Sequence, residues 1–388
     1  MSCYINASQE RLYGAIEGEY GRAASLQASH RISFRSLKVT ERTIRSERND
    51  KTGSRTRSAP HPAVRKDNRF ELACYFSARG AANDPDGVMG LVQAALGGDV
   101  AELGGLQVTG VAGNPPTVTF AGAHGLRVGQ ALRFQGELRF VKAVNSANSV
   151  TLSAPFGTGL QAGATAGNTV TCWPGDKPKP FTLGNYWTPA GSIDRILAGC
   201  VINELAVTLN SDFHGALFRG TAREVVSATG FDAGDTGLTA FPAEPAMTLQ
   251  DRRLVPGHVG RLFIGGVEYF LLDLALRFVN NSDTVTREFG METASCYSAD
   301  VRSVSVQFQL YASDHTAVSQ LHALARSRGE TDLSIQMGDT PGELVGIYIP
   351  RFMPEIPELK DADTRVVMSY PSSLVFGVTN DEISIAFA

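Results

Sequence analysis

Side chains that could catalyse a reaction or bind a metal are sparse in this sequence. His315 and His322 lie two helical turns apart and have no third partner at metal-ligand spacing. Glu355 and Glu358 could act as a general acid and base, but Pro357 between them favours an exposed loop. We therefore predict no catalytic residue, no metal site and no cofactor.

The usual motifs of nucleotide-binding and hydrolytic enzymes are missing as well. The sequence has no GxxxxGK(S/T) phosphate loop, no GxGxxG after a strand, no HExxH and no GxSxG. His124 precedes Gly125 in a predicted turn, where we expect its ring to bond the backbone. The five cysteines are scattered and odd in number, which predicts reduced thiols instead of a disulfide framework.

The most unusual stretch is a basic segment from Glu41 to Asn68, in a chain whose net charge is -4. It contains no large apolar residue between Ile44 and Val64, and His61 is its only aromatic residue. A nucleic-acid arm, a disordered tail and a loop ordered by another subunit are the three possible interpretations. Because nucleic-acid arms combine cations with aromatic or recognition elements, we favour a long loop between two strands that contacts another subunit. A solvated loop tip is the alternative.

Length and composition predict a folded, mainly β protein. The 388 residues suffice for two or three domains, and 43% hydrophobic with 19% charged residues is ordinary for a globular chain. The 40 glycines and 18 prolines, without long helical periodicity, favour short strands joined by turns. The N-terminal residues lack the apolar core of a secretory signal, and no window is apolar enough for a membrane helix. We expect folding in a cytoplasm and no membrane partner.

A strand followed by an amphipathic helix occurs twice. Residues 302–310 alternate apolar and polar side chains, and a helical stripe then ends near Gly329. Residues 68–76 have the same alternation, followed by a helical stripe that ends at Gly97. Because the strands that flank these units also follow the same order, we predict a strand-rich unit, with one flanking helix, that is duplicated in tandem.

A small all-β domain interrupts the first repeat. Short alternating runs separated by Gly, Asn and Pro turns predict its strands: Thr117–Phe120, Ala131–Phe134, Phe140–Val144 and Val150–Leu152. The predicted organisation is a first repeat at 1–103 and 172–245, an inserted domain at 104–171 and a second repeat at 246–388.

Four stretches in a fixed order resemble the major tail proteins, or tail tube proteins, of long-tailed bacteriophages. They are ERLYGAIEGEYGRA, ISFRSLKVTERTIRSERNDKTG, GLVQAALGG and GCVINELAVTLNSD. The resemblance covers most of the chain outside the inserted domain, and its specificity lies in the order of the stretches. Within the inserted domain, PTVTFAGAHGLRVGQALRF and FVKAVNSANSVTLS are similar to small β modules of phage tail and fibre proteins.

The resemblance implies a β-sandwich or half-barrel with one flanking helix, assembled into stacked rings. Such rings form a virion tail tube that is built in the bacterial cytoplasm, contacts other tail proteins at its ends and passes double-stranded DNA during ejection. The long loops, at Glu47–Asp67 and Gly290–Asp300 here, would reach the adjacent ring. The cations expected to make these contacts are Arg48, Lys51, Arg55, Arg57, Arg65 and Lys66.

The duplication favours a homotrimer with pseudo-sixfold symmetry over a hexamer. The channel should avoid strong phosphate binding, because each Lys or Arg contact with DNA adds affinity and drag. Polar strand positions are the candidates for its lining: Asn280, Ser282, Thr284, Thr286 and Glu288. A tail terminator, a decoration protein and a carbohydrate-binding tail protein are the alternatives, although only Trp173 and Trp187 are available to stack on a sugar.

Overall fold

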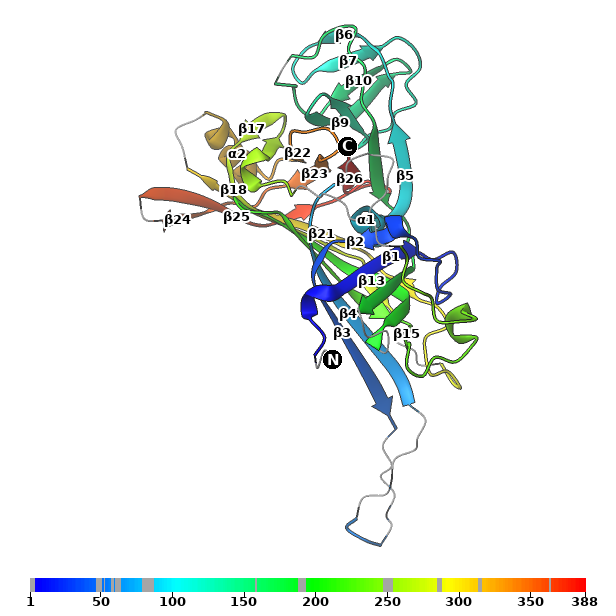
Figure 1. The fold of residues 1–388 in the computed structure, drawn as a ribbon. Helices are drawn as coiled ribbons and strands as arrows, with labels where there is room; N and C mark the ends of the chain where they lie inside the picture. Colours follow the sequence, from blue (N-terminus) through cyan, green and yellow to red (C-terminus); the bar gives the residue numbers. More distant parts are fainter. Residues whose placement is uncertain are drawn as a thin grey trace.

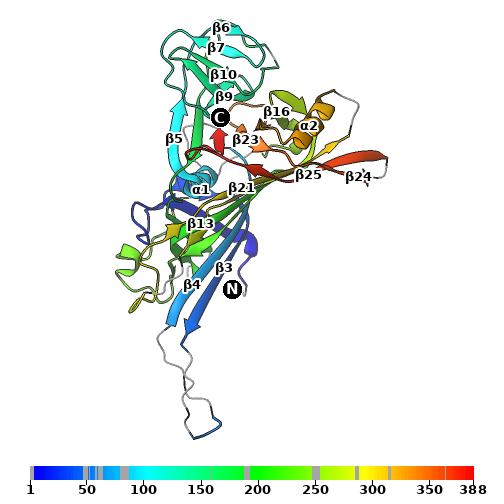
Figure 2. The ribbon, with the colours of Figure 1, turned by 180° about the vertical axis from the view of Figure 1, so that it is seen from behind.

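The computed structural model is mainly β, with an inserted domain projecting from a large antiparallel body (Figures 1 and 2). It describes residues 4–46, 51, 53–56, 59, 64–78, 87–157, 159–187, 193–246, 254–284, 288–312, 316–362 and 364–388. Each of the two repeats carries one α-helix in this described part of the chain. The predicted fold class is therefore confirmed.

The first repeat supplies eight strands and a helix. They are β1 (Glu10–Ile16), β2 (Arg31–Ile32), β3 (Phe34–Arg45), β4 (Val64–Tyr75), α1 (Gly87–Leu96), β12 (Phe181–Trp187), β13 (Arg195–Leu209), β14 (Gly215–Ala222) and β15 (Glu224–Ser227).

The second repeat follows the same order. It comprises β16 (Arg261–Ile264), β17 (Val267–Tyr269), β18 (Leu271–Val279), β21 (Ser303–Tyr311), α2 (Thr316–Ser327), β22 (Thr331–Met337), β23 (Val345–Met353), β24 (Glu358–Ala362), β25 (Arg365–Val375) and β26 (Ser384–Phe387). Between β18 and β21 lie the short strands β19 (Ser282–Asp283) and β20 (Ser298–Ala299).

Strand pairing is repeated along with element order. The pairs β1·β2, β1·β12, β12·β13, β3·β4 and β4·β14 have the counterparts β16·β17, β16·β22, β22·β23, β18·β21 and β21·β25. The long strand β13 pairs with β14 and β15, and in the second repeat β23 and β24 together take its place beside β25 and β26. The two repeats thus share one topology.

The repeats are joined edge to edge in a continuous central sheet. Its strand order is β3-β4-β14-β13 from the first repeat, followed by β18-β21-β25-β24 from the second. The junction is an antiparallel pairing of β13 with β18, from Glu204↔Val279 to Leu209↔Leu274. Strand direction changes along this sheet, so that β3 and β4 run crosswise to β24 and β25 (Figure 1), as twisted sheets require.

Apolar and polar residues alternate along these strands, which explains why one face of the sheet is buried in the core. Phe70, Leu72 and Cys74 of β4 are buried, as are Val304, Val306, Phe308 and Leu310 of β21. Their side chains meet both helices and the smaller strands in one apolar core. On α1 the predicted stripe of Val88, Leu91, Val92 and Ala95 is fully buried, and Gly97 after it has a φ of +81°, which favours glycine.

The inserted domain has its own five-stranded sheet and its own core. Its strands are β6 (Val108–Ala112), β7 (Thr117–Phe120), β8 (Ala131–Phe134), β9 (Glu137–Ser146) and β10 (Ser149–Leu152), in agreement with the predicted runs. It is reached through β5 (Gly97–Leu103) and left through β11 (Thr169–Pro174), which pair with each other. His124 holds the turn as predicted, because its ring nitrogens bond Ser146 O at 3.0 Å and Leu126 N at 2.9 Å.

A buried histidine at the β13–β14 turn predicts acid sensitivity. His214 is 4% exposed, neither ring nitrogen has a partner among the described residues, and burial lowers its pKa to about 4. The unfolded histidine titrates near pH 6.5, so the folded state loses stability as the pH falls from about 6.5 toward 4. We expect His214→Leu to reduce the stability difference between pH 7 and pH 4.5 by about 2 kcal/mol, measured by urea unfolding.

His322→Leu, on α2, is the matched control because it removes a histidine that is not fully buried. An equal pH dependence in the wild type and His214→Leu would contradict this assignment.

Candidate functional site

The open face of the central sheet carries a row of charged residues, one from each of five adjacent strands. They arise from the same alternation that forms the core, since Glu71 follows Phe70 and Arg277 precedes Phe278. We call this row the charge ladder; its members, in strand order, are Lys38, Glu71, Arg219, Glu204 and Arg277.

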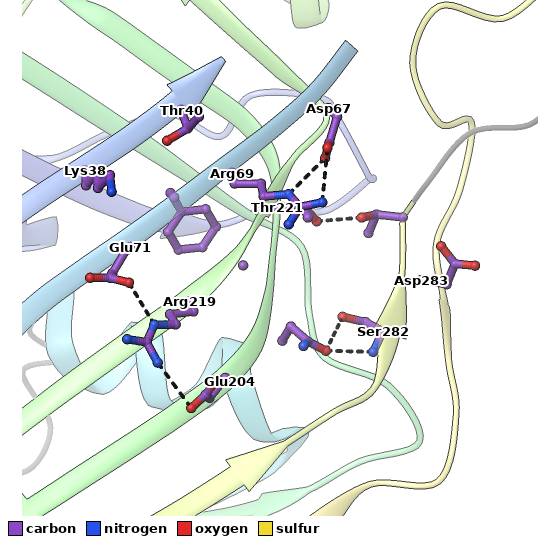
Figure 3. A pocket seen from close by; sticks show the side chains of 14 residues that line it. Lys38, Thr40, Asp67, Arg69, Glu71, Glu204, Arg219, Thr221, Ser282 and Asp283 are labelled. Carbon is purple, nitrogen blue, oxygen red and sulfur yellow. Dashed lines mark hydrogen bonds and ion pairs between the residues drawn. The ribbon is translucent and has the colours of Figure 1, made fainter. Parts of the chain in front are cut away.

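Charges alternate along the ladder and bond across the strands, and Figure 3 shows its central members Glu71, Arg219 and Glu204. Arg219 Nε donates to Glu71 Oε2 at 2.8 Å, and Arg219 Nη1 lies 3.5 Å from Glu204 Oε1. Glu204 also accepts from Arg277 Nε at 2.9 Å, and Lys38 lies opposite Glu71 in register. The hydrogen bond from Glu71 raises the pKa of Arg219, and that from Glu204 raises the pKa of Arg277. Both cations are therefore held beside carboxylates.

A groove of about 430 Å³ is lined by every ladder member except Arg277, and also by residues 282–284 of the chain after β18. Asn203 Oδ1 accepts from the backbone N of Ser282 at 2.8 Å and from its hydroxyl at 3.0 Å. Thr284 Oγ1 lies 2.7 Å from Thr221 Oγ1 (Figure 3). The second repeat thus folds over the first at this position.

A second polar row crosses the strands of the second repeat. Asp273 on β18 lies opposite Gln309, which lies opposite Ser369, whose hydroxyl accepts from Lys360 Nζ at 3.3 Å. Burial raises the pKa of Asp273, and the charge of Lys360 opposes this rise. The open face is therefore polar in both repeats, with cations and carboxylates interspersed.

This arrangement offers paired charges and no reactive group. Exposed ion pairs of this kind are each worth about 0 to 1 kcal/mol, and a cation already paired with a carboxylate attracts phosphate less. In the part of the chain that the structure describes, no group of three His, Cys, Asp or Glu side chains is arranged to hold a metal. No helix in that part is long and apolar enough to cross a membrane.

The residues predicted to line a channel are not all on this face. Asn280 is 4% exposed, and its amide donates to the carbonyls of Ala95 and Ile202, so its side chain is enclosed beneath α1 and the prediction for it was wrong. Ser282 and Thr284 do line the groove. Glu288 lies in the following loop, where it accepts from Ser295 Oγ at 2.8 Å, and Thr286 is outside the described residues.

The residues predicted to form a basic loop divide into two groups. Lys51 and Arg55 are exposed beyond the end of the β3–β4 hairpin, while Arg48 and Arg57 lie outside the described residues. Arg65 and Lys66 belong to β4 itself, because that strand begins at Val64, earlier than the predicted loop end. Lys66 forms an ion pair with Glu224. Both cations therefore lie at the base of the hairpin instead of extending from it.

The second predicted loop, Gly290–Asp300, folds against the first repeat of its own chain. The hydroxyl of Tyr297 donates to Pro178 O at 2.6 Å, and its ring centre lies 5.0 Å from that of Tyr20. The backbone N of Lys66 donates to Glu292 O at 2.9 Å. In this chain the loop thus helps to join the two repeats.

Sequence reasoning missed the charge ladder, although the signal was present. Glu71, Glu204, Arg219 and Arg277 each break an apolar strand at a position out of phase with the buried side chains. The order of the strands in the sheet was needed to recognise that these isolated charges form one row.

No protein-family model matches this chain, and no curated protein matches its sequence.

Glu204 is the ladder member whose replacement should lower stability most, because its side chain is 13% exposed and pairs with two arginines. We expect Glu204→Gln to lower the free energy of unfolding by about 1 kcal/mol, with the loss shrinking at high salt, as measured by urea titration. Glu71→Gln, at a more exposed site, is the matched control and should cost less. Equal losses of unfolding free energy in the two variants would show that Glu204 contributes no more than Glu71.

Proposed function

We propose that this protein is a structural subunit of a phage virion, assembling through its sheet edges into rings that stack into the hollow tail tube for DNA. The observation that carries the proposal is the junction between the repeats. There β13 of one repeat pairs with β18 of the next, so that two identical topologies continue one sheet. A ring would repeat this arrangement between chains.

The outer strands of the central sheet are suited to such a repeat. Within the described residues, β3 pairs only with β4, and β24 pairs only with β25. By topology β24 corresponds to the end of β13 and β3 corresponds to β18, so pairing of β24 with β3 of another chain would reproduce the internal junction. Leu359 on β24 is 68% exposed, and Val366 on the paired strand β25 is exposed as well. An unpaired edge strand that exposes apolar side chains is a template for pairing with another chain.

If β24 of each chain paired with β3 of the next, the sheets would close into a ring, and their open face would become the channel wall. The opposite face is covered by α1, α2 and the smaller strands, which leaves the charge ladder to face inward. Its two arginines are paired with carboxylates, so DNA phosphates would gain little by binding them. This supports passage of double-stranded DNA without specific binding.

Barrel geometry favours three chains over six. Three chains with eight central strands each give roughly 24 strands, about 4.8 Å apart and tilted by about 40°, hence a barrel about 48 Å across. After allowance for side chains this accommodates a DNA duplex, whereas six chains would give a barrel roughly twice as wide. We therefore propose a trimer with pseudo-sixfold symmetry, assembled in the cytoplasm of the bacterial host and located in the phage tail.

Electron microscopy of the purified protein tests the edge pairing directly. The wild type should form rings or tubes, whereas Leu359→Pro, which removes a backbone donor from β24, should remain monomeric with wild-type circular dichroism. Leu359→Thr keeps the donor and is the control. Rings formed equally well by Leu359→Pro would refute the edge pairing, and compact wild-type monomers at every concentration would refute the tube.

Loss of the hairpin tip should affect stacking without affecting ring closure. We expect deletion of residues 54–62 to leave a folded ring that forms tubes at least about tenfold less readily, since the β3–β4 hairpin that carries this loop extends away from the body (Figure 1). Tube length and the critical concentration, measured by microscopy and sedimentation, give the readout. Unchanged tubes would show that the loop makes no contact between rings.

A further inference from the structure

The inserted domain belongs to the first repeat in sequence, yet it is attached to the second repeat in space (Figure 2). Its returning strand β11 pairs with β5 on one side and with β26, the last strand of the chain, on the other. The register runs from Val170↔Phe387 to Cys172↔Ile385. The base of the domain therefore already bridges both repeats.

A buried arginine extends this bridge. Arg139 on β9 is 0% exposed; its Nη1 donates to Gln336 Oε1 on β22 at 2.8 Å, and its Nη2 lies 2.7 Å from Glu137 Oε2. Its guanidinium carbon lies 4.4 Å from the ring centre of Phe263 on β16. Burial lowers the pKa of Arg139 to about 10, so the side chain stays charged at neutral pH. A charge enclosed in this way requires all its partners, which come from both sides of the contact.

Gln336 uses its whole amide for this contact. Its oxygen also accepts from the backbone N of Leu138 at 2.9 Å, and its nitrogen donates to Gly136 O at 2.9 Å and to Gly338 O at 2.8 Å. Lys142 Nζ adds an ion pair with Asp332 at 2.7 Å. Satisfied buried networks of this kind define one relative orientation of the parts they join.

Apolar packing completes the contact. Phe140 stacks on Tyr348 of β23, with ring centres 5.2 Å apart and planes 9° apart, within a buried cluster that includes Leu138 and Leu344. A Cβ added to Gly346 would lie 2.3 Å from Leu138 Cδ2, so the absence of a side chain permits this close approach.

From these contacts we propose that the inserted domain is an internal brace that holds the two repeats at a fixed angle. The repeats are joined directly by the β13·β18 pairing, by a shared apolar core and by the loop at 290–300. The brace adds a further point of attachment, through a buried polar network away from the central sheet. In the first repeat the inserted domain lies between α1 and β12. In the second repeat α2 is followed within a few residues by β22, so the second repeat has no such domain to brace a junction with another chain. The proposal concerns one chain and does not depend on tube formation.

The test measures the distance between the two outer strands of the central sheet. Spin labels attached by non-cysteine chemistry replace Arg42 on β3 and Lys360 on β24, both exposed, and excess unlabelled chain restricts the signal to distances within one molecule. Two variants disrupt the brace while keeping the β11·β26 pairing: Gly346→Val, and replacement of residues 104–168 by an Asn-Gly turn. The turn fits because Leu103 and Thr169 are paired directly.

We expect a narrow distance distribution for the wild type and one at least about twofold broader for both brace variants. Gly110→Val is the matched control, because it makes the same substitution on a strand of the inserted domain where a Cβ meets nothing within 4 Å. A wild-type width in either brace variant, once circular dichroism shows it to be folded, would overturn the proposal. Since intrachain distances are measured, absence of rings or tubes would not affect this result.

Discussion

The antiparallel pairing of β13 with β18 is the interaction on which the rest of the structure depends. Without it each repeat would have two open edges in its main sheet. With it, two edges are paired internally and only β3 and β24 remain at the ends. Because the repeats share their pairing order, the same geometry that joins them is available for joining chains, which is the basis of the proposed assembly.

A sheet used in this way must satisfy different demands on its two faces. The covered face is mainly apolar, and it packs against both helices and the smaller strands. The open face interleaves carboxylates with cations, so that Glu204 and Glu71 hold Arg219 and Arg277. Such pairs add little stability individually, yet they keep a long, flat surface soluble and reduce its attraction for phosphate.

The inserted domain projects from the large antiparallel body (Figure 1), and its contacts give it a role inside the chain. Burial of Arg139 is unfavourable unless its partners are retained, and those partners lie on both the inserted domain and the second repeat. A contact that depends on these partners defines the orientation of the two parts more than it stabilises them. It suits a domain that must set an angle, whereas the far end of the domain remains free for other contacts.

Local sequence by itself determined the elements of this protein. Alternation of apolar and polar residues in 302–310 predicted a strand, and the apolar stripe on α1 predicted a helix. The turns around β7 to β10 predicted the inserted domain. These elements are predictable because burial of one face of a strand or helix imposes a local period of apolar residues. Tertiary structure alone decided which strands are neighbours. Asn280 was predicted to be exposed from its polarity but is enclosed beneath α1, and the charge ladder combines residues more than 200 positions apart. Pairing between distant strands depends on long-range contacts, which leave no local periodicity in the chain.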